Sequence, residues 1–278
     1  MSRIPFVKAH ACGNDFLIIE ESFALNRHAA LARKLCNRNT GIGADGIEFL
    51  DRKKVSETGN QAANEFFLRL FNADGSEAEL SGNGTRCVAA WLAASEGLQQ
   101  VALGTHGGIR TCRLIRRDGV DYWIESDMGV PRVMPRTIEI LGVDAPIDGV
   151  MVNVGNPHFI LFPDNEDFSS HGLTWQQLGA KIAVDPLFPH GTNVEFVRIL
   201  SPSEITFRIY ERGCGPTTSS GTGTCAASTA AIFRHNAARE LTTISEGGAQ
   251  QVSWPTNSSE MLLTGPAEII CTGEVDFA

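Results

Sequence analysis

The sequence predicts an α+β fold of two pseudo-symmetric domains, each a curled, mostly antiparallel sheet around a central helix. Three observations predict it. A Ser-Gly-x-Gly-Thr motif occurs twice, and its serines, Ser81 and Ser220, lie 139 residues apart, which is half of the 278-residue chain. Short runs that alternate apolar and polar residues dominate both halves. Helical periodicity is confined to a few segments, two of which follow the repeated motif.

The repeat extends beyond this motif and predicts the domain division. At the same offset, residues 69–72 (RLFN) match residues 208–211 (RIYE). At slightly different offsets, GNDF at 13–16 resembles GNPHF at 155–159, and Glu48-Phe49 resembles Glu195-Phe196. We therefore expect an N-terminal domain over residues 1–130 and a C-terminal domain over 131–278, whose last strand can cross back to the first domain.

The alternating runs give the expected strands in order. They are 4–9, 15–20, 65–71 and 121–126 in the first half, and 150–154, 158–162, 193–200, 204–210 and 260–265 in the second. The expected helices are 28–37, 85–95, 174–182 and 224–235. The third begins with a capping box of Thr174 and Gln177. The last places Ala226, Thr229, Ala230 and Phe233 on one face.

Composition and charge exclude several classes of protein. The formal net charge is −9 and no Lys/Arg cluster is present, which argues against a nucleic-acid surface and favours a small-molecule ligand. No secretory leader and no run of about 20 apolar residues is found, so we expect a full-length cytoplasmic protein that does not cross a membrane. The seven cysteines are an odd number without CxxC pairs, which predicts reduced thiols and no metal site.

The glycine motifs allow two interpretations. GIGADG at 41–46 and GTGTCA at 221–226 match dinucleotide-binding patterns, but a strand-like run follows the first and no series of βαβ units surrounds either. The SGNGT and SGTGT turns instead direct free amides and a helix dipole toward one point, which is typical of an anion site. In the purely structural interpretation, the two serines are only helix caps. Because the turns form a matched pair, we favour a carboxylate site between the halves.

Polar residues flank these turns and fit an amino-acid ligand. Four asparagines lie beside glycines or turns, and an acid–base pair precedes the second motif; they are Asn14, Asn72, Asn156, Asn193, Glu211 and Arg212. Asparagine in a turn is ordinarily structural. Distributed over both repeats, however, these side chains can hold the ammonium and carboxylate groups of an amino acid. His158 is interpreted either as a core histidine or as one that supports the binding residues.

At these residues the chain resembles the diaminopimelate epimerase family, over almost its whole length. The motifs are HACGNDF, TGIGADG, FNADGSEAELSGNGTRCVAA, VNVGNPHF, HGTNVEFV and YERGCGPTTSSGTGTCAA. The resemblance implies two domains that close over the substrate and an isomerase that inverts one α-carbon of diaminopimelate without a cofactor, in lysine and peptidoglycan precursor synthesis. It implies substrate binding by the six residues above and by the amides of Gly82, Asn83, Gly221 and Thr222. The sequence leaves open whether the chain forms a homodimer.

The chain departs from the family pattern at the centre of the chemistry. The resemblance implies a catalytic cysteine on each face of the α-carbon, and these positions are Ser81 and Ser220 here; Pro216 replaces a family glutamate. Three interpretations follow: an epimerase whose proton transfer is slowed or abolished by native or engineered serines, a related racemase, epimerase or dehydratase for another amino acid such as hydroxyproline, or a non-catalytic amino-acid binder. Cys12 and Cys214 lie near motif residues, where we favour small buried hydrophobic side chains over replacement bases.

Overall fold

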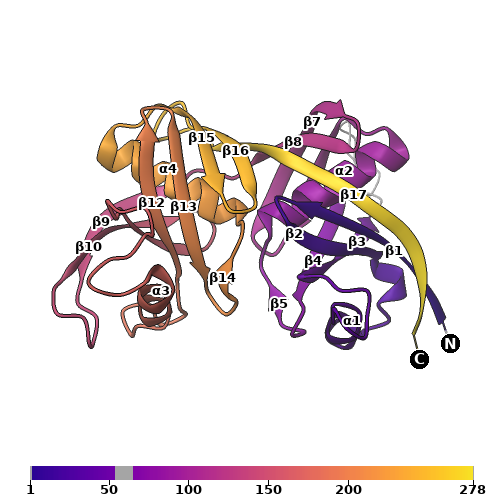
Figure 1. Cartoon of the computed structure of the whole chain (residues 1–278). Coiled ribbons are helices and arrows are strands. Elements are labelled where there is room, and N and C mark those ends of the chain that lie inside the picture. Colours follow the sequence, from indigo (N-terminus) through magenta and orange to yellow (C-terminus); the bar gives the residue numbers. More distant parts are fainter. Residues whose placement is uncertain (1, 54–64, 278) are drawn as a thin grey trace. The chain divides into compact units, whose positions relative to one another are not determined.

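The computed structural model describes residues 2–53 and 65–277, which form two compact units. Unit 1 comprises Met1–Asp127 and Thr264–Ala278, and unit 2 comprises Met128–Leu263 (Figure 1). The sequence predicted a division between residues 130 and 131, with a last strand that can cross back to the first domain. In the structure, Thr264–Ala278 belongs to unit 1, and the division before it falls between Asp127 and Met128.

Unit 1 contains eight complete strands and most of a ninth, together with two α-helices, among the described residues. Its elements are β1 (Ser2–Ala11), β2 (Asn14–Glu20), the 3-10 helix η1 (Glu21–Phe23), α1 (His28–Leu35), β3 (Gly46–Lys53), β4 (Glu65–Asn72), β5 (Glu77–Ala78), α2 (Gly82–Glu96), β6 (Gln100–Thr105), β7 (Gly108–Asp118), β8 (Asp121–Asp127) and β17 (Leu262–Phe277). Residues Leu262 and Leu263 of β17 belong to unit 2.

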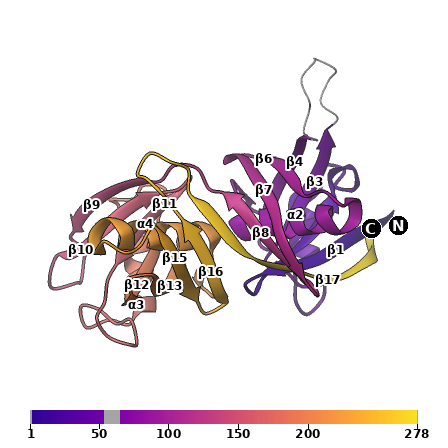
Figure 2. The same ribbon diagram turned by 90° about the horizontal axis from the view of Figure 1, so that it is seen from above.

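The strands of unit 1 curl around α2. Strand β2 is antiparallel to β1 and parallel to β3, and β4 pairs antiparallel with β3 and parallel with β6. Strands β7 and β8 continue the sheet, and β17 pairs with both β8 and β1, which closes it. Figure 2 shows α2 within these strands. Because the helix is enclosed, apolar residues on several of its sides are buried, among them Val88, Ala90 and Leu92.

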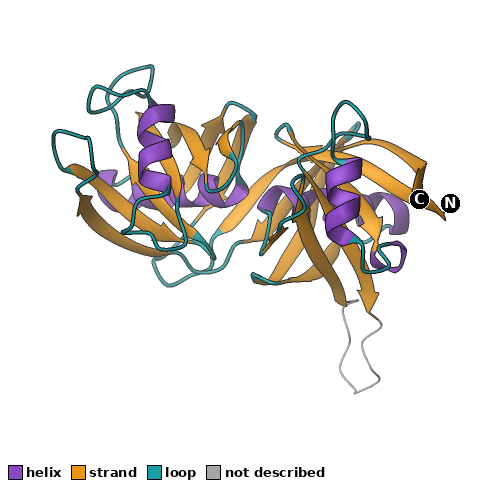
Figure 3. Ribbon diagram, turned by 90° about the horizontal axis from the view of Figure 1, so that it is seen from below, coloured by secondary structure: helices purple, strands orange, loops and turns teal. Residues whose placement is uncertain are grey.

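Unit 2 repeats this arrangement. Its elements are β9 (Arg132–Ile138), β10 (Ile147–Asn153), β11 (Pro157–Leu161), α3 (Trp175–Ala183), β12 (Asn193–Ser201), β13 (Glu204–Glu211), β14 (Gly215–Thr217), α4 (Gly221–His235), β15 (Glu240–Ser245) and β16 (Gly248–Ser253). The order of pairings is the same, with β11 parallel to β12, β12 antiparallel to β13 and β13 parallel to β15. The expected α+β class with two pseudo-symmetric domains is confirmed, and strands predominate in Figure 3.

The central helices begin earlier than the sequence suggested. Their first residues are Gly82 and Gly221, so the glycine-containing turn is the first turn of each helix rather than a loop before it. On α4, Ala226, Thr229 and Ala230 are buried as expected, but Phe233 is 44% exposed, and its expected place on the same buried face is wrong. Phe233 lies in the last turn of α4, which includes the exposed Arg234 and His235.

No helix in residues 2–53 and 65–277 is both long and apolar enough to span a bilayer.

Candidate active site

Ser81 is the N-cap of α2 in unit 1. Its backbone is extended, and its Oγ atom accepts a hydrogen bond from the Gly84 amide at 3.0 Å. Its carbonyl accepts the first helical hydrogen bond, from Thr85. This is the geometry that serine favours at the start of a helix. Gly82 and Asn83 are the first residues of the helix, and the backbone amides at a helix N-terminus are the groups that bind anions.

Ser220 has the same role in unit 2. It is the N-cap of α4, and its Oγ accepts from the Gly223 amide at 3.2 Å. The Oγ1 atom of Thr222 lies 3.4 Å from Ser220 Oγ. Ser220 and Thr222 are both buried within the unit. The repeat seen in the sequence is therefore also a repeat of local geometry, with one capped helix start in each unit.

Neither serine is activated by a neighbouring base. Within the described residues, the hydroxyls of Ser81 and Ser220 hydrogen-bond only to helix amides and, for Ser220, to Thr222. A serine nucleophile or base needs an adjacent histidine, carboxylate or amine, because its hydroxyl is not ionised at neutral pH. A helix N-terminus lowers the pKa of a cysteine into the neutral range, but serine starts from a much higher value.

In unit 1, Asn14 and Asn83 are joined in one network. Asn83 Nδ2 donates to Asn14 Oδ1 at 3.1 Å, and Asn14 Nδ2 donates to Asp45 Oδ2 at 2.7 Å. The Arg86 guanidinium donates to Asn83 Oδ1 at 2.5 Å. Asn72 is the last residue of β4, and its Nδ2 donates to Ser76 Oγ. The structure therefore brings Asn14 to the start of α2, while the hydrogen bond described for the Asn72 side chain goes to Ser76 and not to this network.

A charged cluster supports Asn14. Asp15 accepts hydrogen bonds from both Nη atoms of Arg38 and lies 3.1 Å from Lys8 Nζ. Burial alone would raise the pKa of Asp15, but the hydrogen bonds and charges of Arg38 and Lys8 outweigh it and lower that pKa below its usual value. Arg38 also binds Asp45, the partner of Asn14. The Asp15 carboxylate thus stays ionised near neutral pH and binds Arg38, which also contacts Asp45.

In unit 2, a hydrogen-bonded chain joins the helix start to a buried carboxyl. Asn156 Nδ2 donates to Thr222 Oγ1 at 3.3 Å, and its Oδ1 lies 2.8 Å from His158 Nε2. The other ring nitrogen of His158 is 2.6 Å from Glu195 Oε1. Burial raises the pKa of Glu195, and the His158 ring acts in the opposite direction. His158 is thus a buried residue whose ring contacts both Asn156 and Glu195.

Asn193, Glu211 and Arg212 lie at one end of β12 and β13. Asn193 Oδ1 accepts from the Arg212 amide at 2.9 Å, and its Nδ2 donates to the Pro157 carbonyl. Glu211 accepts a hydrogen bond from the Thr217 hydroxyl. Asn193 therefore fixes the backbone from which the Arg212 side chain projects.

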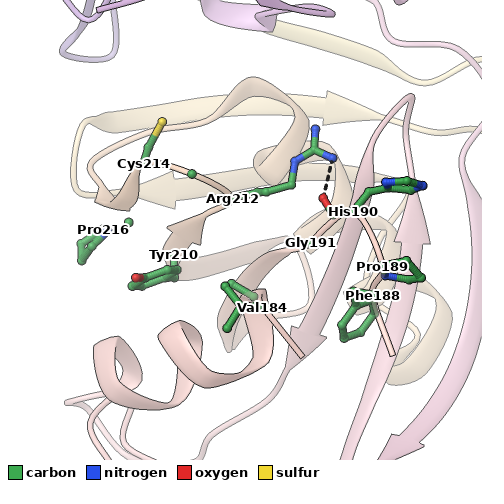
Figure 4. Close-up of a pocket in the computed structure, with 12 residues that line it drawn as sticks. Val184, Phe188, Pro189, His190, Gly191, Tyr210, Arg212, Cys214 and Pro216 are labelled. Atoms are coloured by element: carbon green, nitrogen blue, oxygen red, sulfur yellow. Dashed lines mark hydrogen bonds between the residues drawn. The ribbon is translucent and has the colours of Figure 1, made fainter. Parts of the chain in front are cut away.

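A surface pocket of about 690 Å³ adjoins Arg212 in unit 2 (Figure 4). Its walls are Ala183, Val184, Phe188, Pro189, His190, Gly191, Tyr210, Gly213, Cys214, Gly215 and Pro216. The Arg212 guanidinium donates to the His190 carbonyl at 3.2 Å. Of the residues selected from the sequence as substrate-binding, only Arg212 lines this pocket.

No cysteine is the N-cap of either central helix. Cys87 and Cys225 are fully buried inside α2 and α4, and burial raises the pKa of the Cys87 thiol far above its usual value. Cys12 is buried, as expected. Cys214 is exposed, which corrects the expectation of a buried hydrophobic side chain, because the turn between β13 and β14 leaves it at the surface. The described residues hold no cluster of three or more potential metal ligands.

Four supporting residues were missed in the sequence reading. They are Arg38, Asp45, Glu48 and Glu195, which contact the candidate site residues or the central helix starts. The sequence did contain a signal for the two glutamates, which is the match between Glu48-Phe49 and Glu195-Phe196. Glutamate is rarely buried in a strand without a partner, so its repetition in two apolar strands points to a specific role.

Comparison with known proteins assigns the chain to a family. The family model for diaminopimelate epimerase matches residues 6–134 and 150–270. The diaminopimelate epimerase of Desulforudis audaxviator (strain MP104C) is 35% identical over 289 residues, which cover 98% of this chain and 99% of that protein.

Solved structures agree on the fold. A PhzF-family phenazine biosynthesis protein from Bacillus anthracis superposes with a TM-score of 0.73 at 14% identity and full coverage of both chains. A probable proline racemase from Agrobacterium radiobacter K84 gives a TM-score of 0.72 at 16% identity, covering 99% of this chain and 93% of that one. At such identities the likeness shows the fold alone. The match of the family model and the identity to the relative together show that this chain is a member of the diaminopimelate epimerase family.

Proposed function

We propose that the chain binds 2,6-diaminopimelate, and that Ser81 and Ser220 occupy the two proton-transfer positions of an LL/meso epimerase. The observation that carries this proposal is the matched pair of capped helix starts, one in each repeat, on a chain that belongs to the family. With serine at both positions, we expect the interconversion of the two isomers to be abolished or greatly slowed. In this proposal the protein is cytoplasmic and acts in lysine and peptidoglycan precursor synthesis.

The reaction places specific demands on each helix start. One group removes the α-proton while the electron pair stays on the substrate as a carbanion, and a second group returns a proton to the opposite face. The amides of Gly82, Asn83, Gly221 and Thr222 would hold the α-carboxylate and stabilise its growing negative charge. Proton removal needs an ionised group, and the serines, bonded only to helix amides and Thr222 within the described residues, have no base that could ionise them.

The distal end of the substrate is assigned to the asparagines and the acid–base pair. Glu211 would receive an ammonium group, and Arg212 with Asn72, Asn156 and Asn193 would receive a carboxylate, since a guanidinium binds a carboxylate through two parallel hydrogen bonds. Asn14 would bind beside the α2 start, where it already contacts Asn83.

The decisive experiment restores the thiols. Wild type, Ser81→Cys, Ser220→Cys and the double variant are incubated in D2O with LL- and with meso-diaminopimelate, and deuterium at the α-carbon and isomer inversion are both measured. We expect neither in the wild type, exchange of one isomer at most in each single variant, and inversion in the double variant, because a thiol on each face then provides both acid and base.

The alternatives give different results in the same assay. Turnover of hydroxyproline or another amino acid by the wild type would identify a related racemase or dehydratase. Binding of diaminopimelate by a folded double variant, with neither exchange nor inversion, would mean that the site serves only binding or other chemistry, and the epimerase assignment would then be abandoned. Light scattering of the same samples shows whether the chain forms the homodimer that the sequence leaves open.

A further inference from the structure

The carboxyl group of Glu48 lies against the first turn of α2. Glu48 is on β3 and is 1% exposed. Its Oε1 atom is 2.0 Å from the position that a Cβ atom on Gly84 would take, so the carboxyl fills the space of a side chain at that residue. The amide of Gly84 also donates to Ser81 Oγ. Glu48 and the helix cap Ser81 therefore contact the same residue of the helix start.

Unit 2 holds a glutamate at the equivalent place. Glu48 pairs with Leu70 of β4, and Glu195 pairs with Ile209 of β13, which stands 139 residues after Leu70, the offset that separates the two serines. Glu195 Oε1 is 3.1 Å from the position of a Cβ atom on Gly223, the counterpart of Gly84. The two carboxyls therefore occupy equivalent positions in the two repeats.

The partner of this carboxyl differs between the repeats. In unit 2, Glu195 pairs with Ile160 of the neighbouring strand. His158 stands two residues before Ile160 and contacts the carboxyl group of Glu195. In unit 1, the residue two positions before Ile18, which pairs with Glu48, is Phe16. A phenylalanine cannot donate a hydrogen bond, and Glu48 Oε1 has no hydrogen-bond partner among the described residues.

Burial keeps the Glu48 carboxyl mostly protonated at pH 7. Burial raises its pKa to about 8. The strand neighbours that pair with it, Ile18 and Leu70, are apolar. Arg86 on α2, Asp15 on β2 and Cys12 in the β1–β2 turn are charged or titratable groups that, like Glu48, act on the Cys87 thiol. Arg86 donates a hydrogen bond to Asn83, and Asp15 binds Arg38 and Lys8.

We propose that Glu48 is a positioning residue for the carboxylate-binding helix start of unit 1 and that it acts in its protonated form. The inference rests on the proposed function. The N-terminus of a helix carries about half a positive charge, which attracts anions. A neutral Glu48 packs against the turn without offsetting this positive charge, which remains available to bind the ligand carboxylate. An ionised Glu48 offsets the charge and repels the ligand carboxylate. The affinity for the ligand therefore falls as Glu48 loses its proton.

The test is the pH dependence of binding. The dissociation constant of meso-diaminopimelate is measured by calorimetry at pH 6.5, 7.5, 8.5 and 9.5 for wild type, Glu48→Gln and Glu48→Met. Glu20→Gln, on the neighbouring strand and paired with Arg52, is the matched control. Titration of the ligand's own amines is common to all samples and cancels in the ratio of wild type to variant.

The dissociation constant of the wild type divided by that of Glu48→Gln should be near one at pH 6.5 and should rise on the order of tenfold by pH 9.5. A change of this size is expected when one like charge is added at short range from the ligand carboxylate. Glu48→Met should show the same pH dependence of binding as Glu48→Gln, because both side chains are neutral and Oε1 of Glu48 has no hydrogen bond to lose. The methionine variant replaces the glutamine variant in the comparison if the latter does not fold. A purely structural role would give an offset independent of pH. A constant ratio with binding intact overturns the inference and leaves the proposed function standing. Absence of binding by every form overturns the proposed function and this inference with it.

Discussion

Replacing Glu48 with glutamine should stabilise the protein, by an amount that depends on pH. The change removes an ionisable group but keeps its shape, since Gln is isosteric with protonated Glu. The pKa of Glu48 is about 8 in the folded chain against an ordinary value of 4.5. Below pH 4.5 the group is protonated in both states and has no effect on folding.

The magnitude follows from the two pKa values. Between pH 4.5 and pH 8, Glu48 ionises readily only in the unfolded chain. Each pH unit in this range therefore lowers the free energy of unfolding of the wild type by about 1.4 kcal/mol. Above pH 8 the carboxyl ionises in both states and the difference becomes constant. The wild type therefore loses up to about 5 kcal/mol relative to Glu48→Gln as pH rises from 4.5 to 8.

The assay is urea unfolding followed by circular dichroism, at pH values from 4.5 to 9, for wild type, Glu48→Gln and the partly exposed control Glu20→Gln. The free energies of unfolding of wild type and Glu48→Gln should diverge up to pH 8 and then run parallel. Curves that stay parallel over the whole range would refute the reasoning, because they would show that Glu48 ionises as freely in the folded protein as in the unfolded chain.

Three further outcomes are expected. Gly84→Ala should destabilise the chain by roughly 1–3 kcal/mol in thermal or urea unfolding, because its Cβ would be 2.0 Å from Glu48 Oε1; adding Glu48→Ala should recover part of the loss, and no recovery would mean that this contact is not the cause. Arg212→Ala should weaken binding of diaminopimelate much more than binding of a short amino acid, measured by calorimetry, and equal losses would contradict a distal role. A thiol reagent should modify Cys214 and Cys271 quickly and the five buried cysteines slowly, and fast reaction of more than two thiols per chain would contradict the burial described.

Sequence patterns predicted most of the architecture because they report local physics. The alternation of apolar and polar residues predicted strands that were found, such as β4, β12 and β13. The capping box at Thr174 was found where expected, since its hydrogen bonds span only three residues. The errors were local too: Phe233 has helical spacing with buried residues, but the spacing does not reveal that the last turn of α4 is solvent-exposed.

The sequence by itself determined the duplication and the two serine-capped helix starts, because these depend on residue identity and short spacing. Only the tertiary structure decided which polar groups meet. Asn14 contacts Asp45, and His158 contacts Glu195, through strands that are distant in the sequence and joined by parallel pairing. The glutamate repeated in both halves binds a histidine in unit 2, whereas Oε1 of Glu48 has no hydrogen-bond partner among the described residues of unit 1. The strand register is the same in both repeats and places His158 or Phe16 at the equivalent position beside the glutamate, so only the folded chain shows what the difference between these two residues does.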